Sequence, residues 1–100
     1  MYMRRGDVVE FEWDKGNLDK SYQKHGITPN EAEEVFLDEW VAIKPDITHS
    51  LKEKRFIAIG TSSTKEILFI IFTLRSNRVR IISARVANKK ERSTYENEKT

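Results

Sequence analysis

Apolar residues concentrate in the second half of the chain, in three segments with the length and composition of β-strands: Arg55–Gly60, Glu66–Leu74 and Val79–Arg85. Short polar stretches separate these segments, and Asn77 lies in the second turn. Consecutive strands joined by short turns predict an antiparallel meander. Because Glu66–Leu74 is apolar almost throughout, we expect an interior strand that is covered on both faces.

The N-terminal part of the chain predicts one strand and one helix. Val8–Trp13 alternates apolar and polar side chains, which is typical of a half-buried first strand. Asp14 is a suitable N-cap for a helix that begins at Lys15. Gly26 stands where a glycine commonly ends a helix.

Two later helices carry clear start signals. Thr28-Pro29-Asn30-Glu31 has the spacing of a capping box, in which the first and fourth side chains each accept a hydrogen bond from the other's backbone amide. This second helix should end near Asp38. Asn88-Lys89-Lys90-Glu91 repeats the spacing and predicts a last helix that continues to about Glu98.

The fold class follows from the order of these elements. A short strand is expected at Trp40–Ile43, followed by a long polar loop at Lys44–Lys54. The order β-α-α-(β)-β-β-β-α predicts an α+β domain that spans residues 1–100. Two N-terminal helices and one C-terminal helix accompany a small antiparallel sheet.

Composition narrows the class of protein. The chain has no cysteine, which excludes disulfide scaffolds and cysteine zinc sites and favours the cytoplasm. The longest apolar run, Ile67–Thr73, is far shorter than the ~20 residues of a membrane helix. No apolar signal-peptide region follows the N-terminus, so we expect a cytoplasmic protein without a membrane partner.

The charges are unevenly distributed. Residues 1–50 contain 6 Lys and Arg against 11 Asp and Glu, whereas residues 51–100 contain 12 against 5. From Arg75 to Arg92 the only acidic residue is Glu91. Such a local excess of positive charge favours nucleic acid or an acidic protein as a partner, although a solvated basic face would look the same.

Several short motifs together resemble the BrnT family of type II toxins. They are Phe11-Glu12-Trp13-Asp14, Asn17, Lys24-His25-Gly26-Ile27, Glu31-Ala32, Val35-Phe36, His49-Ser50, Arg55–Gly60, Thr73-Leu74-Arg75, Arg80–Arg85, Glu91-Arg92 and Tyr95-Glu96. Each motif is weak alone, but their order and spacing are specific together. One departure is Asp38-Glu39-Trp40, where family members often have Asp-Pro.

The resemblance implies a RelE/ParE-like α+β fold and cleavage of RNA. It also implies neutralisation by a DNA-binding, BrnA-like antitoxin that represses its own operon, with a heterotetramer as a candidate assembly. Two other functions stay open on the same fold. They are a non-catalytic binding module and a ParE-like inhibitor of a topoisomerase, because a fold alone does not determine function.

RNA can be cleaved without a metal ion or cofactor if a base, an acid and a cation act together on the phosphate. The sequence offers no compact group of Asp and Glu that resembles a magnesium site, so we expect the metal-free route. Arg80 and Arg85 are the candidate catalytic cations, and Arg75 and Arg78 are candidate RNA contacts. In a regular strand, Arg78 and Arg80 share one face and Arg85 points to the other, unless a bulge re-aims one. Alternatively, at least one of these arginines forms a structural ion pair with an N-terminal acid.

His25 is the candidate general base or acid, since its pKa suits proton transfer near neutral pH. It could equally cap the end of its helix. The remaining candidate RNA-binding residues are Lys24, His49, Trp13 and Tyr95. For Trp13 the alternative is a place in the core or at its rim, and for Tyr95 it is docking of the last helix.

Overall fold

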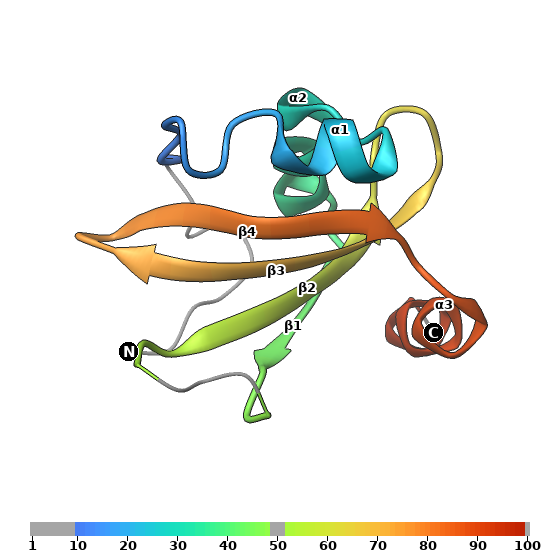
Figure 1. The fold of residues 1–100 in the computed structure, drawn as a ribbon. Coiled ribbons are helices and arrows are strands. Elements are labelled where there is room, and N and C mark those ends of the chain that lie inside the picture. The colour runs from blue at the N-terminus through green and yellow to red at the C-terminus, as the bar shows by residue number, and fades with distance from the viewer. Residues whose placement is uncertain (1–9, 49–51, 100) are drawn as a thin grey trace.

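The computed structural model describes residues 10–48 and 52–99. The elements, in chain order, are α1 (Lys20–His25), α2 (Pro29–Glu34), the 3-10 turn η1 (Val35–Leu37), β1 (Ala42–Pro45), β2 (Arg55–Thr61), β3 (Ile67–Arg75), β4 (Arg78–Val86) and α3 (Lys89–Glu98) (Figure 1). This is the predicted α+β arrangement, and it is compatible with a RelE/ParE-like fold. Of the helices in these two ranges, none has the length and apolar composition needed to cross a membrane.

The four strands form one antiparallel sheet in the order β1-β2-β3-β4. The meander is therefore confirmed, and β3 is an interior strand as predicted. The β3–β4 hairpin turns at Ser76 and Asn77, both of which have positive φ (51° and 66°). Two such residues in succession are the mark of the tight turn that matches the twist of antiparallel strands.

The two faces of the sheet are covered unequally. Helices α1 and α2 lie on one side of the sheet, and α3 lies beyond its other side at one end (Figure 1). On the helix side, Phe72 is fully buried, and the ring of Phe36 meets it edge-on at 5.0 Å. On the other side of β3, Phe69 and Ile71 are only half-buried. The expectation that both faces of β3 are covered is thus correct for one face only.

The N-terminal segment differs most from the prediction. In the described part of Val8–Trp13, a single parallel bridge joins Phe11 to Val79 of β4, instead of a full strand. Val8 and Val9 lie outside the described residues. The prediction of a helix from Lys15 is wrong, because α1 begins at Lys20.

The physical reason for the late start of α1 lies in the side chains before it. The carboxylate of Asp14 accepts a hydrogen bond from the backbone of Gly16, two residues on, and is also bound by Arg80. Asp19 adopts a positive φ of 64°, which interrupts helical geometry directly before α1. These contacts hold residues 15–19 in turns, so the capping signal of Asp14 is used for a turn rather than for a helix.

The other helix signals are confirmed. Gly26 follows α1 with φ +73°, the left-handed conformation that ends helices. Thr28 and Asn88 each form the complete capping box, with Glu31 and Glu91 respectively. The short strand predicted at Trp40–Ile43 exists but lies two residues later, so β1 takes the first two residues of the expected loop. The loop residues 49–51 are outside the described ranges.

Candidate functional site

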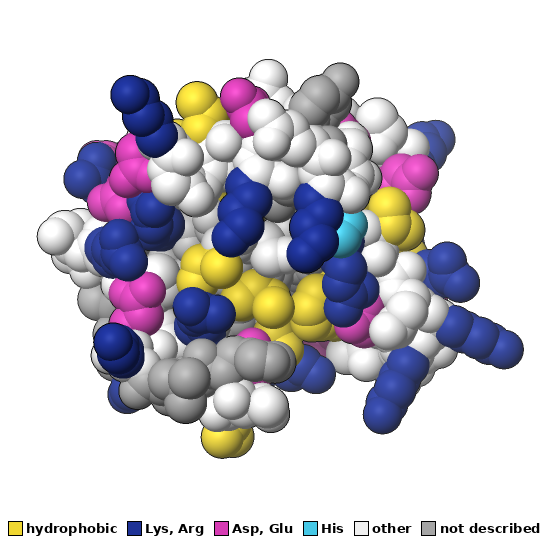
Figure 2. Space-filling model, in the orientation of Figure 1, with side chains coloured by type: hydrophobic (Ala, Val, Ile, Leu, Met, Phe, Trp, Pro, Cys, Tyr) yellow, Lys and Arg dark blue, Asp and Glu magenta, His cyan; other side chains and the backbone are white. Residues whose placement is uncertain are grey.

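One face of the sheet is not covered at its centre by any helix of residues 10–48 and 52–99, and it is here called the open face (Figure 1). Cross-strand partners share a face of a sheet. The partners Ile57 and Ile71, and the partners Phe69 and Arg85, therefore lie on the side opposite Phe72. Figure 2 shows a hydrophobic patch over β2 and β3, bordered by Lys and Arg side chains, with a histidine side chain at its margin. An apolar surface with a cationic border is suited to a polyanion that also presents flat, apolar bases.

A bulge decides which arginines reach the open face. The pairing of β3 with β4 shifts between Ile71 and Phe72, whose partners are Ser83 and Ile81. Ile82 is therefore an extra residue in β4, and the alternation of faces is reversed beyond it. Arg80, opposite Thr73, and Arg85, opposite Phe69, consequently share the open face.

Arg85 lies at the border of the apolar patch. Its guanidinium carbon is 4.3 Å from the centre of the Phe69 ring, a cation–π contact. Its Nη1 and Nη2 donate to the two carboxylate oxygens of Glu91 at 2.8 and 2.9 Å. These hydrogen bonds raise the pKa of Arg85, and its side chain is still 36% exposed. Arg85 is a fixed cation with access to solvent.

The guanidinium of Arg80 binds two carboxylates of the N-terminal segment. Its Nη1 donates to Glu12 at 3.0 Å and to Asp14 at 2.9 Å, and its Nη2 donates to the second oxygen of Asp14 at 3.0 Å. The hydrogen bonds to Asp14 and Glu12 raise the pKa of Arg80, although its burial acts in the opposite direction. The Arg80 side chain is only 13% exposed. The alternative of a structural ion pair with an N-terminal acid is therefore realised at Arg80.

Arg75 and Arg78 flank the β3–β4 turn and are the more exposed members of this basic group. Arg75 donates to both oxygens of Glu53, at 3.1 and 3.3 Å, and lies 3.7 Å from Glu12. Arg78 lies 3.5 Å from Glu12. Both side chains remain nearly half exposed, so these surface pairs leave them able to contact a phosphate.

Lys24 and His25 form the exposed end of α1. Helix α1 packs against β4, the strand that carries Arg85. Within the two described ranges, no side-chain partner holds the His25 imidazole. The capping alternative for His25 thus gains no contact, and the His25 side chain is exposed.

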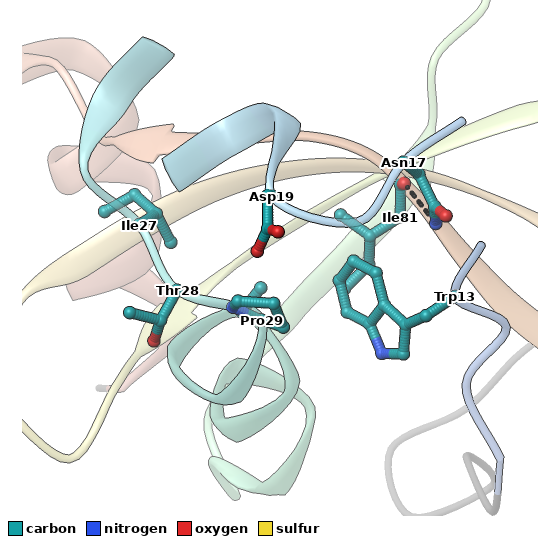
Figure 3. A pocket seen from close by; sticks show the side chains of 8 residues that line it. Trp13, Asn17, Asp19, Ile27, Thr28, Pro29 and Ile81 are labelled. Atoms are coloured by element: carbon teal, nitrogen blue, oxygen red, sulfur yellow. Dashed lines mark hydrogen bonds between the residues drawn. The ribbon is translucent and has the colours of Figure 1, made fainter. Parts of the chain in front are cut away.

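Trp13 lies on the helix side of the sheet. Its indole Nε1 donates to Glu33 of α2 at 2.6 Å, and its ring packs against the core. The ring faces a small hollow that Pro29 and Ile81 also line (Figure 3). The free volume of about 10 Å³ is no larger than one water molecule, so the hollow has no room for a base.

Tyr95 docks α3 onto the sheet. The side chain is buried, its hydroxyl donates to Asp38 at 2.5 Å, and it accepts from the Thr61 hydroxyl at 2.8 Å. Burial and the hydrogen bond to Asp38 raise the pKa of Tyr95. Burial alone would raise the pKa of Asp38, but hydrogen bonds from Tyr95 and from the backbone of Trp40 and Thr61 outweigh it and lower that pKa. These contacts favour the docking role of Tyr95 over contact with RNA.

Phe69 and Glu91 both contact Arg85, although the sequence pattern assigns neither of them to the site. The apolar run Glu66–Leu74 predicts a strand covered on both faces, so nothing in the sequence marks the half-exposed ring of Phe69. The spacing Arg85–Glu91 was visible, but the capping box explained Glu91 without a second contact. His49 lies outside the described residues. Among residues 10–48 and 52–99, no three His, Asp or Glu side chains are grouped to hold a metal ion.

Comparison with known protein families gives a match that covers most of the chain. A family model described as the ribonuclease toxin BrnT of type II toxin–antitoxin systems matches residues 13–91. The match covers both capping boxes, the whole sheet and the Arg85–Glu91 pair. No curated protein matches the chain. The chain belongs to the BrnT family of type II toxin–antitoxin ribonuclease toxins.

Proposed function

We propose that this chain is itself an active endoribonuclease, which binds RNA on the open face and cleaves it without a metal ion. The observation that carries the proposal is Arg85, a cation fixed at the edge of the half-exposed patch of Ile57, Phe69 and Ile71. Bases can stack or pack on this patch while Arg85 binds the adjacent phosphate.

In the proposed reaction, the ribose 2′-oxygen attacks the neighbouring phosphorus and the bond to the 5′-oxygen breaks. The products are a 2′,3′-cyclic phosphate and a 5′-hydroxyl. Arg85 stabilises the negative charge that develops on the phosphorane oxygens. His25 transfers one proton, either from the attacking hydroxyl or to the leaving oxygen, and solvent water takes up or supplies the other.

Lys24, Arg75 and Arg78 are proposed to contact RNA phosphates, since all three are exposed cations. For Arg80 we propose a supporting role, because its guanidinium already binds two carboxylates. Trp13 and Tyr95 are left out of the proposed site, because their polar atoms are bonded within the fold.

We also propose that a BrnA-like, DNA-binding antitoxin neutralises the chain, with a heterotetramer as the resting assembly in the cytoplasm. The membership of a type II family supports an antitoxin partner and an RNA target. The stoichiometry and the antitoxin class come from the resemblance alone.

The test is cleavage of a defined RNA by the purified protein in excess EDTA, with analysis of the product ends. Arg85→Ala should lower the rate by roughly a hundredfold or more. His25→Ala should lower it by about a hundred- to ten-thousandfold. Lys15→Ala is the charge-matched control, because Lys15 is exposed and lies outside the proposed site.

Folding of each variant is checked by circular dichroism before its rate is compared. Near wild-type rates for both folded variants would place the site elsewhere. A wild type that is silent until magnesium is added would refute the metal-free route. Inhibition of a topoisomerase without RNA cleavage would favour the ParE-like alternative.

A further inference from the structure

The pair between Arg85 and Glu91 has a geometry that leaves part of the guanidinium free. Glu91 takes the end of the guanidinium, where Nη1 and Nη2 lie side by side. The Phe69 ring covers one of its flat faces. Nη1 also donates to the Val86 carbonyl at 3.3 Å, whereas no described residue accepts a hydrogen bond from Nε. Because the side chain is 36% exposed, the side edge formed by Nε and Nη2 can donate to a ligand.

We infer that Glu91 is a positioning residue, which holds Arg85 with its side edge directed towards the scissile phosphate. This inference rests on the proposed function of Arg85. Two N–H groups on that edge match two oxygens of a phosphate, just as the other edge matches the carboxylate. Arg85 therefore binds Glu91 and phosphate at the same time, and neither has to displace the other.

Glu91 is itself held firmly. Its Oε1 accepts a second hydrogen bond, from the backbone of Asn88 at 2.9 Å, and its own amide donates to the Asn88 side chain at 2.9 Å. One turn later in α3, Tyr95 fixes the helix to Thr61 and Asp38. The orientation of Arg85 is thus coupled through α3 to the body of the sheet.

A rigid arginine matters more for the rate than for affinity. An arginine side chain on a strand has many rotamers, and fixing one of them in the transition state would cost free energy. Here the contact with Glu91 fixes the side chain before RNA binds, so this cost is not added to the activation barrier. The negative charge of Glu91 weakens the pull of Arg85 on phosphate in the ground state. The first effect predicts that loss of Glu91 lowers kcat, and the second predicts that KM stays similar or falls.

The opposite role for Glu91 makes a different prediction. If the carboxylate merely occupied Arg85 and competed with RNA, its removal would free the cation and raise activity. The positions of Nη1 and Nη2 argue against competition, since Glu91 binds both of them and leaves Nε without an acceptor among the described residues. The direction of the change in kcat separates the two roles.

The experiment compares Glu91→Ala, Glu91→Gln and Asn88→Ala with the wild type, using kcat and KM for one RNA oligonucleotide. Glu91→Ala should lower kcat by at least ~tenfold, with KM unchanged or reduced. Glu91→Gln keeps one acceptor and should fall in between. Asn88→Ala removes the side chain that accepts from the Glu91 amide but keeps the Glu91 carboxylate on Arg85 and on the Asn88 backbone amide, so it should lose stability and lower kcat clearly less than Glu91→Ala does.

Two further comparisons distinguish failure of the positioning role of Glu91 from failure of the proposed function. In an Arg85→Ala background, Glu91→Gln should cause no additional loss of kcat, because Glu91 then has no cation to position. If Arg85→Ala lowers kcat but Glu91→Ala and Glu91→Gln keep or raise it, the positioning role is refuted and the proposed function stands. If Arg85→Ala is as active as the wild type, the proposed function itself fails. Should Glu91→Ala not fold, Glu91→Gln, which retains the cap acceptor, decides the question.

Discussion

Arg80 and Arg85 lie on the same face of β4 although five positions separate them, because the bulge at Ile82 reverses the alternation of side chains. The two guanidinium groups nevertheless have different partners at different ends of the strand. Arg80 binds Glu12 and Asp14 of the N-terminal segment, and Arg85 binds Glu91 of α3. A shared face therefore does not make them one catalytic pair, and their substitution should have different consequences.

Arg80→Ala should act mainly on stability. The change removes the charged hydrogen bonds to Glu12 and Asp14 and should lower the free energy of unfolding, although solvent screens the exposed pair with Asp14. Urea unfolding measures this change. In the Arg80→Ala background, Glu12→Gln should cost less than it does alone, because its main partner is already absent. A folded Arg80→Ala protein with unchanged stability but no cleavage would instead indicate a direct catalytic role.

Tyr95→Phe should destabilise the docking of α3. The ring stays buried, but Asp38 loses the hydroxyl donor at 2.5 Å and Thr61 loses its acceptor. We expect a loss of about 1–2 kcal/mol in the free energy of unfolding, measured by urea denaturation. Ser93→Ala, an exposed change on the same helix, is the control and should cost clearly less. Equal effects of the two changes would contradict the docking role.

The hydrogen bond between Tyr95 and Asp38 predicts that the stability of the protein depends on pH at both extremes. The folded pKa of Asp38 is below its ordinary value of 3.8, so its contribution is present above that pH and is lost as the pH falls through the folded pKa. The folded pKa of Tyr95 is above its ordinary value of 10.0, so its contribution is present below pH 10.0 and is lost as the pH rises through the folded pKa. Thermal unfolding across pH tests both limbs. Tyr95→Phe should flatten the alkaline limb, and an unchanged alkaline limb would contradict the assignment.

The elements that the sequence predicted correctly rest on local signals. The capping boxes at Thr28 and Asn88 involve residues three positions apart, so their chemistry is legible without knowledge of the fold. The interior position of β3 follows from its own apolar composition. These features required no knowledge of distant contacts.

The parts that the sequence could not predict depend on distant partners. Asp14 carries the signal of a helix cap, but Arg80, 66 positions later, binds its carboxylate. Arg80 and Arg85 share a face of β4 only because of the bulge at Ile82, and no residue type in the sequence marks that bulge. Tyr95 and Trp13 were ambiguous because their partners, Asp38 and Glu33, come from other segments. The apolar patch with Arg85 at its edge likewise becomes visible only when the register of three strands is known.

If an antitoxin neutralises this chain, an inactive variant should compete with the wild type for that antitoxin. A BrnA-like protein, added in equimolar amount, should suppress RNA cleavage by the wild type. Arg85→Ala removes a partly exposed side chain and its pair with Glu91 but leaves the core and the Tyr95 contacts of α3 in place, so this variant should still bind the antitoxin. An excess of Arg85→Ala should then sequester the antitoxin and restore cleavage by the wild type, measured as a titration. Light scattering on the purified complex tests the proposed heterotetramer. Full inhibition that no amount of folded Arg85→Ala relieves would mean that Arg85 is itself needed for antitoxin binding, and a co-expressed pair that elutes as free monomers would refute the partnership.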